Sequence, residues 1–313
     1  SKLNYDIKIK SYKGALLKYV NLPANGPLSL LYDAVSIMRS INSDNMLILG
    51  VSGSWVLPFF RILSPRTNII ANIDGIEWRR EKWGFFTKLL LKYLEKIIVK
   101  YSNRIILDNK ALIKDFEKNN KRFNEKIKII EYGGDHINLK NDSTSSKNYF
   151  VSVSRIEPEN NVELILKCFS ELVNFKIIYI GNWQNSNFGM ELFQKYSFHE
   201  NMDLLDPVYD QEIIDKYRSD SIAYIHGHSQ GGTNPSLVEA MSLGLPCICY
   251  NCSYNIETTR NEAFYFTNSD ELKLVLNEVN PLKLKLNASR MKVIANKCYK
   301  WSDIADKYIK ELI

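Results

Sequence analysis

Residues 226–246, HGHSQGGTNPSLVEAMSLGLP, decide the fold of this chain because they join a strand end, a glycine turn and a capped helix. The apolar run at residues 221–225 predicts a buried strand just before them. Asn234 is a typical N-cap residue, Pro235 suits the first helical position, and Gly244 predicts where the helix ends. The segment therefore predicts a strand, a turn and a helix in succession, as in an α/β domain.

This segment is suited to binding an anion. Gly231 and Gly232 let the backbone approach a ligand closely, and the free amides at the start of the helix attract phosphate. Glu239 lies one turn into the same helix, where a carboxylate is suited to accepting hydrogen bonds from sugar hydroxyls. The glycines alone are equally typical of an ordinary strand–turn–helix, since they match neither the dinucleotide motif nor the Walker loop.

Length and composition indicate a globular protein. The chain has 313 residues, of which 45% are hydrophobic and 24% charged, enough for two domains of ordinary size. No apolar run reaches about 18 residues, and the N-terminus lacks a signal-peptide pattern. The five cysteines are odd in number, which favours reduced thiols and a cytoplasmic location. Cys247, Cys249 and Cys252 have no matching ligand pair, so we expect no metal site. The net charge of +6 is too mild to predict a nucleic-acid partner.

Apolar runs alternate with helical patterns along the chain, which predicts a parallel α/β architecture. We expect an N-terminal domain over residues 1–140, a C-terminal domain over residues 148–297, and a last helix within residues 298–313. The polar stretch at residues 138–148 is the expected linker. Strands are expected at residues 6–11, 46–51, 68–73, 104–107, 127–131, 149–154, 175–181, 202–204, 221–225 and 246–250. Helices are expected at residues 27–41, 54–63, 83–101, 110–118, 161–172, 211–218, 234–243 and 301–313.

The helix expected at residues 83–101 carries a row of lysines. Lys88, Lys92, Lys96 and Lys100 recur every four residues and therefore share one face. Two interpretations of this face stay open: a solvated surface, or attraction to anionic lipid, to which each basic residue adds about 1 kcal/mol. The side expected to face the core is formed by Leu89, Leu90, Tyr93, Leu94, Ile97 and Ile98.

Three charged residues follow expected strands. Asp74, in the segment NIDGIEWRR of residues 72–80, and Asp108 each come after a buried strand, and Arg155 follows the strand at residues 149–154. Ligands of open α/β sheets bind at the carboxyl ends of the strands, so these positions are candidate site residues. A structural Asp-Gly turn and a surface arginine are the alternative interpretations.

Taken together, these motifs resemble the retaining GT-B glycosyltransferases. In that superfamily a glycine-rich turn precedes a helix with a glutamate, then Gly-Leu-Pro and a buried strand, as at residues 231–250. Two glutamates eight residues apart are usual; Glu239 is the second, and Gly231 replaces the first. The sequences GGTNPS and DGIEWRR resemble the bacterial rhamnosyltransferase-type branch of glycosyltransferase family 4, with its Asp-Gly-x-Glu-Trp-Lys/Arg-Arg motif.

The resemblance implies two Rossmann-like domains that face each other across a cleft, and it implies roles for particular residues. An arginine at Arg155 holds the donor diphosphate, while the lysine usual nearby is replaced by Asn160 and Asn161. Glu239 binds ribose hydroxyls, and the loops at residues 181–183 and 207–209 are candidates to hold the base. The implied catalytic residues are Asp74, Asp108 and Arg155. The implied donor-binding residues are Arg155, Gly231, Gly232, Thr233, Asn234, Glu239 and Tyr209, and the acceptor-side residues are Glu77, Trp78, Arg79 and Arg80.

The implied function is metal-independent, retaining transfer of a hexosyl group, with rhamnose from dTDP-rhamnose as the expected donor. The expected acceptor is a saccharide or lipid-linked saccharide of bacterial surface polysaccharide synthesis. We expect no cofactor, a cytoplasmic location and a peripheral contact with the anionic inner face of the membrane. By resemblance, the N-terminal domain lacks its first strand and glycine loop, and the last helix packs back on it. The alternatives are an enzyme acting on a UDP- or GDP-sugar, including an epimerase, or a non-catalytic membrane or interaction module.

Overall fold

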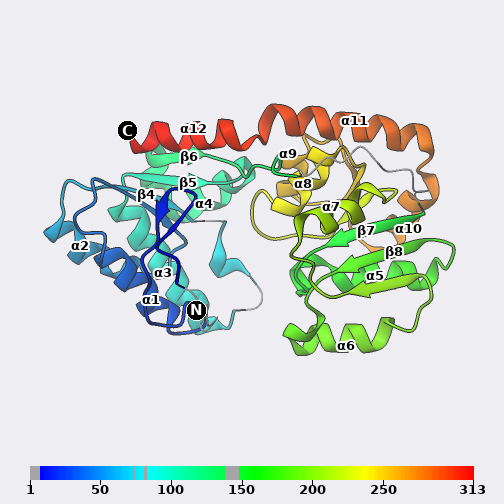
Figure 1. The fold of residues 1–313 in the computed structure, drawn as a ribbon, viewed down its shortest axis with the longest axis horizontal. Helices are drawn as coiled ribbons and strands as arrows, with labels where there is room; N and C mark the ends of the chain where they lie inside the picture. Colours follow the sequence, from blue (N-terminus) through cyan, green and yellow to red (C-terminus); the bar gives the residue numbers. More distant parts are fainter. Residues whose placement is uncertain (1–7, 74, 81–82, 138–147) are drawn as a thin grey trace. The chain divides into compact units, whose positions relative to one another are not determined.

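The computed structural model describes residues 8–73, 75–80, 83–137 and 148–313, which form two compact units (Figure 1). Unit 1 contains residues 1–107, 114–128 and 309–313, and unit 2 contains residues 108–113 and 129–308. The linker expected at residues 138–148 lies almost entirely outside the described residues.

Unit 1 is built on a four-stranded sheet in the order β3-β4-β5-β6. Strands β3, β4 and β5 are parallel, with Ile70 of β4 opposite both Leu47 of β3 and Arg104 of β5. Every residue of β4 after Asn68 is buried, as expected for a central parallel strand. The strands are β3 (Asn45–Leu49), β4 (Asn68–Asn72), β5 (Arg104–Leu107) and β6 (Ile127–Ile129). The helices are α1 (Ser29–Met38), α2 (Leu57–Leu63), α3 (Phe85–Tyr101) and α4 (Ile113–Asn120).

The start of the described chain differs from the expected strand at residues 6–11. Residues 8–10 form no strand, while residues 6 and 7 lie outside the described part. Instead β1 (Ser11–Tyr12) and β2 (Ala15–Leu16) form a short antiparallel hairpin. Lys13 has a positive φ of 47°, and the chain reverses there at a Lys-Gly pair, which a sequence pattern of apolar residues does not reveal.

The buried face of α3 agrees with the expected one at Leu94 and Ile98 and differs from it at Leu89 and Tyr93. Leu91, Leu94 and Ile98 are buried, and their spacing of three and four residues marks the side that packs on the sheet. Leu89 and Tyr93, expected in the core, are 59% and 61% exposed. Apolar residues occupy so much of the helix circumference that their periodicity alone does not decide which of them face the core. The exposed face of α3 is therefore partly apolar.

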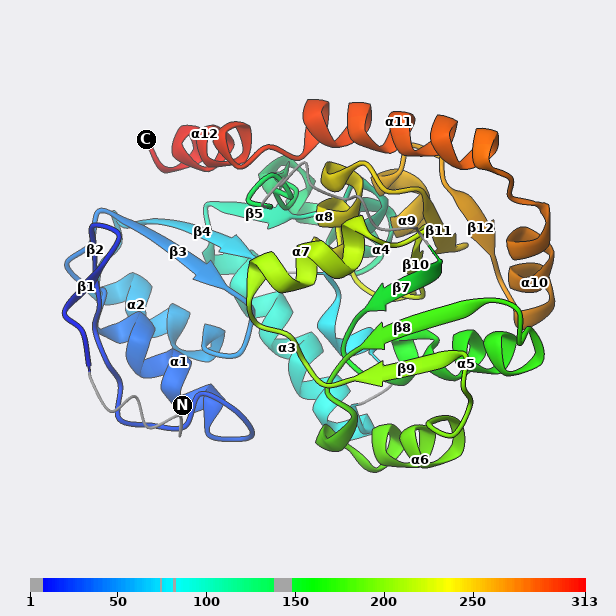
Figure 2. The ribbon, with the colours of Figure 1, turned by 45° about the vertical axis from the view of Figure 1, so that its right-hand side comes forward.

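Unit 2 is built on a six-stranded, wholly parallel sheet in the order β12-β11-β10-β7-β8-β9. Figure 2 shows β7, β8 and β9 side by side, with α5 and α6 on one side of them. The strands are β7 (Tyr149–Val153), β8 (Lys176–Ile180), β9 (Met202–Leu205), β10 (Tyr224–His226), β11 (Cys247–Tyr250) and β12 (Phe264–Phe266). The helices are α5 (Val162–Glu171), α6 (Asn187–Tyr196), α7 (Gln211–Ser219), α8 (Pro235–Leu243), α9 (Ser253–Thr258), α10 (Ser269–Glu278), α11 (Pro281–Cys298) and α12 (Trp301–Leu312).

Side chains that alternate along the strands build a core on each face of this sheet. Phe150 of β7 packs in the cluster that also contains α5 and α10, whereas the next residue, Val151, packs in the cluster with α8 and α11. Cys247 and Cys249 share the second cluster and are fully buried. A parallel sheet covered by helices on both faces is the arrangement that the alternation of strands and helices predicted.

Candidate functional site

The sheet of unit 2 has a topological switch point between β7 and β10. These two strands are neighbours, but the chain continues from β7 to β8 on one side and from β10 to β11 on the other. The loops after their carboxyl ends therefore run in opposite directions. In open α/β sheets, ligands bind between two such loops. Arg155 is in the loop after β7, and the glycine turn is in the loop after β10.

The turn and helix that follow β10 have the predicted local structure. The Asn234 side chain accepts a hydrogen bond from the amide of Ser236 at 3.0 Å, with Pro235 in the first turn and Gly244 as C-cap. This confirms the predicted start and end of the helix. The amides of this first turn lie at the positive end of the α8 dipole, where an anion is attracted.

Asp108 packs directly against the glycine turn. A Cβ atom on Gly232 would lie 1.7 Å from Asp108 Oδ1, so only glycine fits there. The Thr233 hydroxyl donates to the Asp108 carbonyl at 2.5 Å. The next residue, Asn109, is also bonded within unit 2: its side-chain amide donates to the carbonyl of Tyr254 in α9 at 3.2 Å. The structure thus brings Asp108 together with the predicted donor residues of the turn, inside unit 2.

The Arg155 side chain is more than half exposed, at 56%. Its Nη2 atom lies 3.5 Å from Glu157 Oε2 and 3.6 Å from Glu159 Oε1. Asn160, at the place where the resemblance implied a lysine, donates to the Arg155 carbonyl at 2.7 Å and lies 2.7 Å from His228 Nδ1. An amide at position 160 therefore ties the loop after β7 to the loop after β10, a role that a lysine does not fill.

His226 and His228 are both buried in this region. Burial lowers the pKa of His226 well below its usual value, and the nearby His228 lowers the pKa further. His226 is consequently neutral at physiological pH. The positive charge at these two loops comes from Arg155 rather than from His226.

The carboxylate of Glu239 has a partner on each oxygen. Arg218 Nη2 of α7 lies 2.5 Å from Glu239 Oε2, and His136 Nε2 lies 3.2 Å from Glu239 Oε1. The Arg218 side chain is only 1% exposed, and its Nη1 lies 3.3 Å from Asp215 Oδ1. Sequence reasoning missed Arg218, because one arginine on a polar helix is typical of a solvated surface. In the sequence, the only local indication that the Arg218 guanidinium is paired is Asp215, three residues before it on the same helix.

Two candidate base-binding loops have different surroundings. The ring of Trp183 is fully buried against Tyr179 and Phe193, and its indole N–H donates to the Leu205 carbonyl at 3.0 Å. The Trp183 ring is therefore part of the core of unit 2, and the loop at residues 181–183 stays a candidate through its other groups. Tyr209 is 90% exposed on the loop after β9.

The predicted acceptor-side residues belong to unit 1, and Asp74 lies outside the described residues. Glu77 accepts from the indole of Trp83 at 3.0 Å and pairs with Arg80 at 3.0 Å. Arg79 pairs with Asp115 of α4 at 2.7 Å. These contacts hold the segment after β4 on the helices of unit 1.

Trp78 completes this anchoring through a buried carboxyl group. Its indole N–H donates to Glu95 Oε2 at 2.9 Å, and Asn120 donates to Glu95 Oε1 at 2.9 Å. Burial raises the pKa of Glu95, and the hydrogen bonds from Asn120 and Trp78 partly oppose that rise. Sequence reasoning did not single out Glu95, since a glutamate inside an amphipathic helix is ordinarily exposed.

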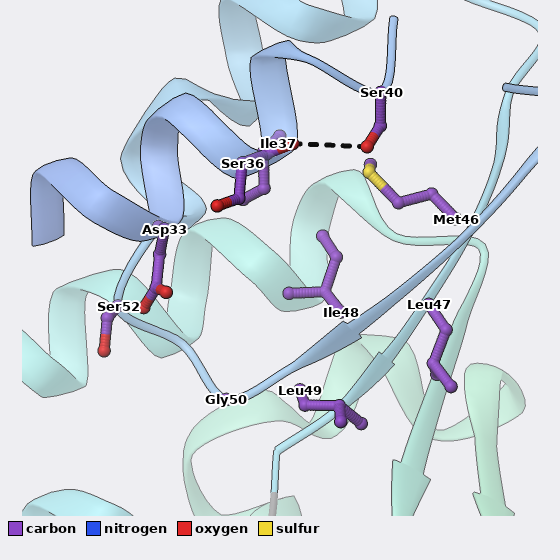
Figure 3. A pocket seen from close by; sticks show the side chains of 11 residues that line it. Asp33, Ser36, Ile37, Ser40, Met46, Leu47, Ile48, Leu49, Gly50 and Ser52 are labelled. Atoms are coloured by element: carbon purple, nitrogen blue, oxygen red, sulfur yellow. Dashed lines mark hydrogen bonds between the residues drawn. The ribbon is translucent and has the colours of Figure 1, made fainter. Parts of the chain in front are cut away.

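A separate cavity of about 180 Å³ lies in unit 1, between α1 and β3 (Figure 3). Asp33, Ser36 and Ser52 supply polar groups, and burial raises the pKa of Asp33. None of the predicted site residues lines this cavity. Among the residues described, no group of three or more His, Cys, Asp or Glu side chains is placed to hold a metal ion. None of the described helices is both long and apolar enough to cross a membrane.

Two protein families match adjacent parts of the sequence, which meet at residue 135. Residues 135–288 match the family Glycosyl transferases group 1, and residues 4–135 match a Domain of unknown function (DUF1972). Residues 135–288 are therefore similar to group 1 glycosyltransferases. The glycosyltransferase match includes the whole six-stranded sheet and both loops of the switch point. No curated protein sequence matches this chain.

Solved structures similar to this chain have the same fold. HepE from Anabaena, in complex with UDP and glucose, has a TM-score of 0.73 at 16% identity, over 92% of this chain and 83% of HepE. Sucrose-phosphate synthase from Thermosynechococcus elongatus has a TM-score of 0.76 at 12% identity, over 93% and 81%. TarM has a TM-score of 0.67 at 16% identity, and this chain spans 58% of its length. The predicted α/β fold of the GT-B type is thereby confirmed.

Proposed function

We propose that this protein is a retaining, metal-independent glycosyltransferase that moves a hexosyl group, with dTDP-rhamnose as donor, to a saccharide or lipid-linked saccharide acceptor of bacterial surface polysaccharide. The observation that supports the donor site is the convergence of three features at one switch point. These are the exposed guanidinium of Arg155, the capped start of α8 and the carboxylate of Glu239. We propose residues 1–140 as the acceptor-side domain and residues 148–297 as the nucleotide-sugar domain.

The proposed mechanism is electrostatic. As the bond between sugar and diphosphate breaks, negative charge grows on the leaving phosphate. Arg155 and the amides around Gly232 and Thr233 would stabilise that charge without rearranging. Glu239 would accept hydrogen bonds from the nucleoside sugar. Asp108, buried beside the turn, would hold the turn in place and orient the transferred sugar or the acceptor hydroxyl.

In a retaining reaction of this kind, the acceptor hydroxyl attacks from the face that the diphosphate leaves. The departing phosphate oxygen takes the proton of the acceptor hydroxyl, so the protein supplies no separate base. Asp74 and the residues Glu77–Arg80 are our candidates for contacts with the acceptor or the transferred sugar.

A UDP- or GDP-sugar is the second candidate donor, and two observations favour it. HepE was solved with UDP and glucose, and the pneumococcal O-GlcNAc transferase GtfA, which has a TM-score of 0.64, was solved with UDP and GlcNAc. A ribose also offers two neighbouring hydroxyls to the Glu239 carboxylate, whereas the deoxyribose of dTDP offers one.

A panel of donors tests this proposal. Purified protein is given dTDP-, UDP- and GDP-sugars with a chelator present, and release of nucleoside diphosphate is measured with and without saccharide acceptors. We expect turnover without divalent ions and the highest kcat/KM with dTDP-rhamnose. Turnover that strictly requires a divalent ion would contradict the metal-free mechanism, and preference for a UDP- or GDP-sugar would replace the donor.

We also propose that the enzyme works in the cytoplasm, in peripheral contact with the anionic face of the membrane. The exposed face of α3 supports this contact. Phe85, Leu89 and Tyr93 are spaced four residues apart and are 76%, 59% and 61% exposed, so they form one apolar stripe. Lys96 and Lys100 extend the same face with exposed positive charge. Aromatic residues beside lysines on one helix face are typical of helices that lie at a lipid interface.

Removing the two exposed lysines should weaken binding to anionic vesicles. Each basic residue near such a surface contributes about 1 kcal/mol, so Lys96→Gln with Lys100→Gln should lower partitioning roughly 30-fold. The measurement is sedimentation of the whole chain with vesicles of phosphatidylglycerol and phosphatidylcholine. Lys285→Gln with Lys297→Gln, two exposed lysines of α11, is the matched control. Equal loss in both pairs, or no preference for anionic over neutral vesicles, would contradict the contact.

A further inference from the structure

Glu239 is held by two side chains of different chemistry, and this determines how it can act. Arg218 is nearly fully buried and always charged, and its Nη2 lies 2.5 Å from Glu239 Oε2. His136 contacts the other oxygen from a loop outside the sheet and is 40% exposed. What His136 contributes depends on which of its ring nitrogens carries the proton.

A third residue decides that question. The indole N–H of Trp301 lies 3.1 Å from His136 Nδ1, and an indole nitrogen is only ever a donor. His136 Nδ1 must therefore be an acceptor and carry no proton. The proton of the neutral ring is then on Nε2, the nitrogen that lies 3.2 Å from Glu239 Oε1. In this tautomer His136 donates a hydrogen bond to the carboxylate.

Trp301 is itself held by residues 132–135, which precede His136 in the chain. Its own amide donates to Asp135 Oδ1 at 2.8 Å. A Cβ on Gly133 would lie 2.6 Å from the indole ring, so the ring fills the space that glycine leaves. The Tyr132 ring meets the indole edge to face at 6.4 Å. Trp301 is 40% exposed, and these contacts on the covered side of the ring orient its N–H towards His136.

We propose that Arg218, His136 and Trp301 are positioning residues for Glu239: Arg218 holds one oxygen of its carboxylate, and Trp301 holds His136 as the tautomer that donates to the other oxygen. A carboxylate has about four acceptor positions, and these two partners use one on each oxygen. One position on each oxygen then stays available to the hydroxyls of a sugar nucleotide. The proposal rests on the proposed function in one respect, namely that Glu239 binds the donor.

The tautomer is measurable without any ligand. Nitrogen-15 spectra of the imidazoles distinguish a protonated from an unprotonated Nδ1, and the chain has four histidines to resolve. His136→Gln assigns the His136 signals, and His199 serves as an internal reference. We expect wild-type His136 with its proton on Nε2, and a mixture of tautomers in Trp301→Phe, which keeps an aromatic ring but removes the N–H. A proton on Nδ1 in the wild type, or an unchanged spectrum in Trp301→Phe, would overturn the proposal.

Nucleotide binding is the second readout, with UDP and dTDP as calorimetric probes. Loss of one oriented hydrogen bond should raise the Kd of Trp301→Phe roughly 2- to 10-fold. His136→Ala should raise the Kd similarly, and His136→Gln, which can still donate to Glu239, should restore part of the loss. A changed tautomer with an unchanged Kd in a protein that binds would overturn the positioning role. If the wild type binds neither probe, the proposed function fails, while the tautomer measurement still decides how His136 is held.

Discussion

Glu239→Ala should lower the free energy of unfolding by about 3 kcal/mol, because it leaves a buried guanidinium without its closest carboxylate. Arg218 is 1% exposed and lies 2.5 Å from Glu239. Asp215 would remain as its partner at a longer 3.3 Å, which is why we expect the lower end of the range for broken buried pairs. The same variant should also lose nucleotide binding.

Urea denaturation of three variants separates this effect from the loss of any ion pair. Glu262→Ala removes a pair of similar length, 2.6 Å from Arg290, but both side chains are exposed, so we expect a change of about 0–1 kcal/mol. Glu239→Leu combined with Arg218→Met and Asp215→Asn removes all three charges of this buried group and should recover much of the stability that Glu239→Ala loses. A Glu239→Ala protein as stable as Glu262→Ala would show that the buried pair does not stabilise this unit.

Arg155→Ala should lower kcat/KM for sugar transfer by about 10- to 100-fold, because a hydrogen bond to a charged partner contributes about 1.5–3 kcal/mol. Arg155 is 56% exposed, so we expect the unfolding free energy to change little. A helix terminus acts on an exposed charge by only about 0.3–1 kcal/mol. Asn234→Ala, which removes the cap of α8, should therefore reduce turnover less than Arg155→Ala.

Steady-state kinetics of the two variants with one donor provide the comparison. Thermal unfolding of both proteins checks that each is folded at the assay temperature, since removal of a cap costs about 1 kcal/mol. Arg155→Lys is a useful third variant, because it keeps the charge and loses the forked geometry. If Arg155→Ala reduces turnover no more than Asn234→Ala, Arg155 does not bind the diphosphate.

Those parts of the fold that depend on local chemistry could be predicted from the sequence. Helix α8 has an N-cap, a proline and a C-terminal glycine within eleven residues, and its predicted bounds are those observed within one residue. Helix α11 was not predicted, although Asn280 and Pro281 begin it in the same way. Its buried residues are only Asn287, Met291 and Ala295, so its apolar pattern is too sparse to mark a helix face. Helix α6 and the three-residue strand β12 were likewise not predicted.

In the candidate site, the sequence predicted individual residues but not the contacts between them. Asp108 and Glu239 were singled out, but the residues that hold them come from far along the chain. Thr233 meets Asp108 across 125 positions, and Trp301 meets His136 across 165. Arg218 and Glu239 are on different helices, α7 and α8. No local periodicity encodes such pairs, because they form only when helices and loops from separate parts of the chain pack together in the folded protein.

Calorimetric titration of the whole chain with UDP and with dTDP, in the presence of a chelator, tests the central claim that the β7–β10 switch point binds a nucleoside diphosphate. We expect one bound nucleotide per chain in the wild type and clearly weaker binding in Arg155→Ala and Glu239→Gln. A folded wild-type protein that binds neither nucleotide would contradict nucleotide binding at the switch point and favour a non-catalytic interaction module.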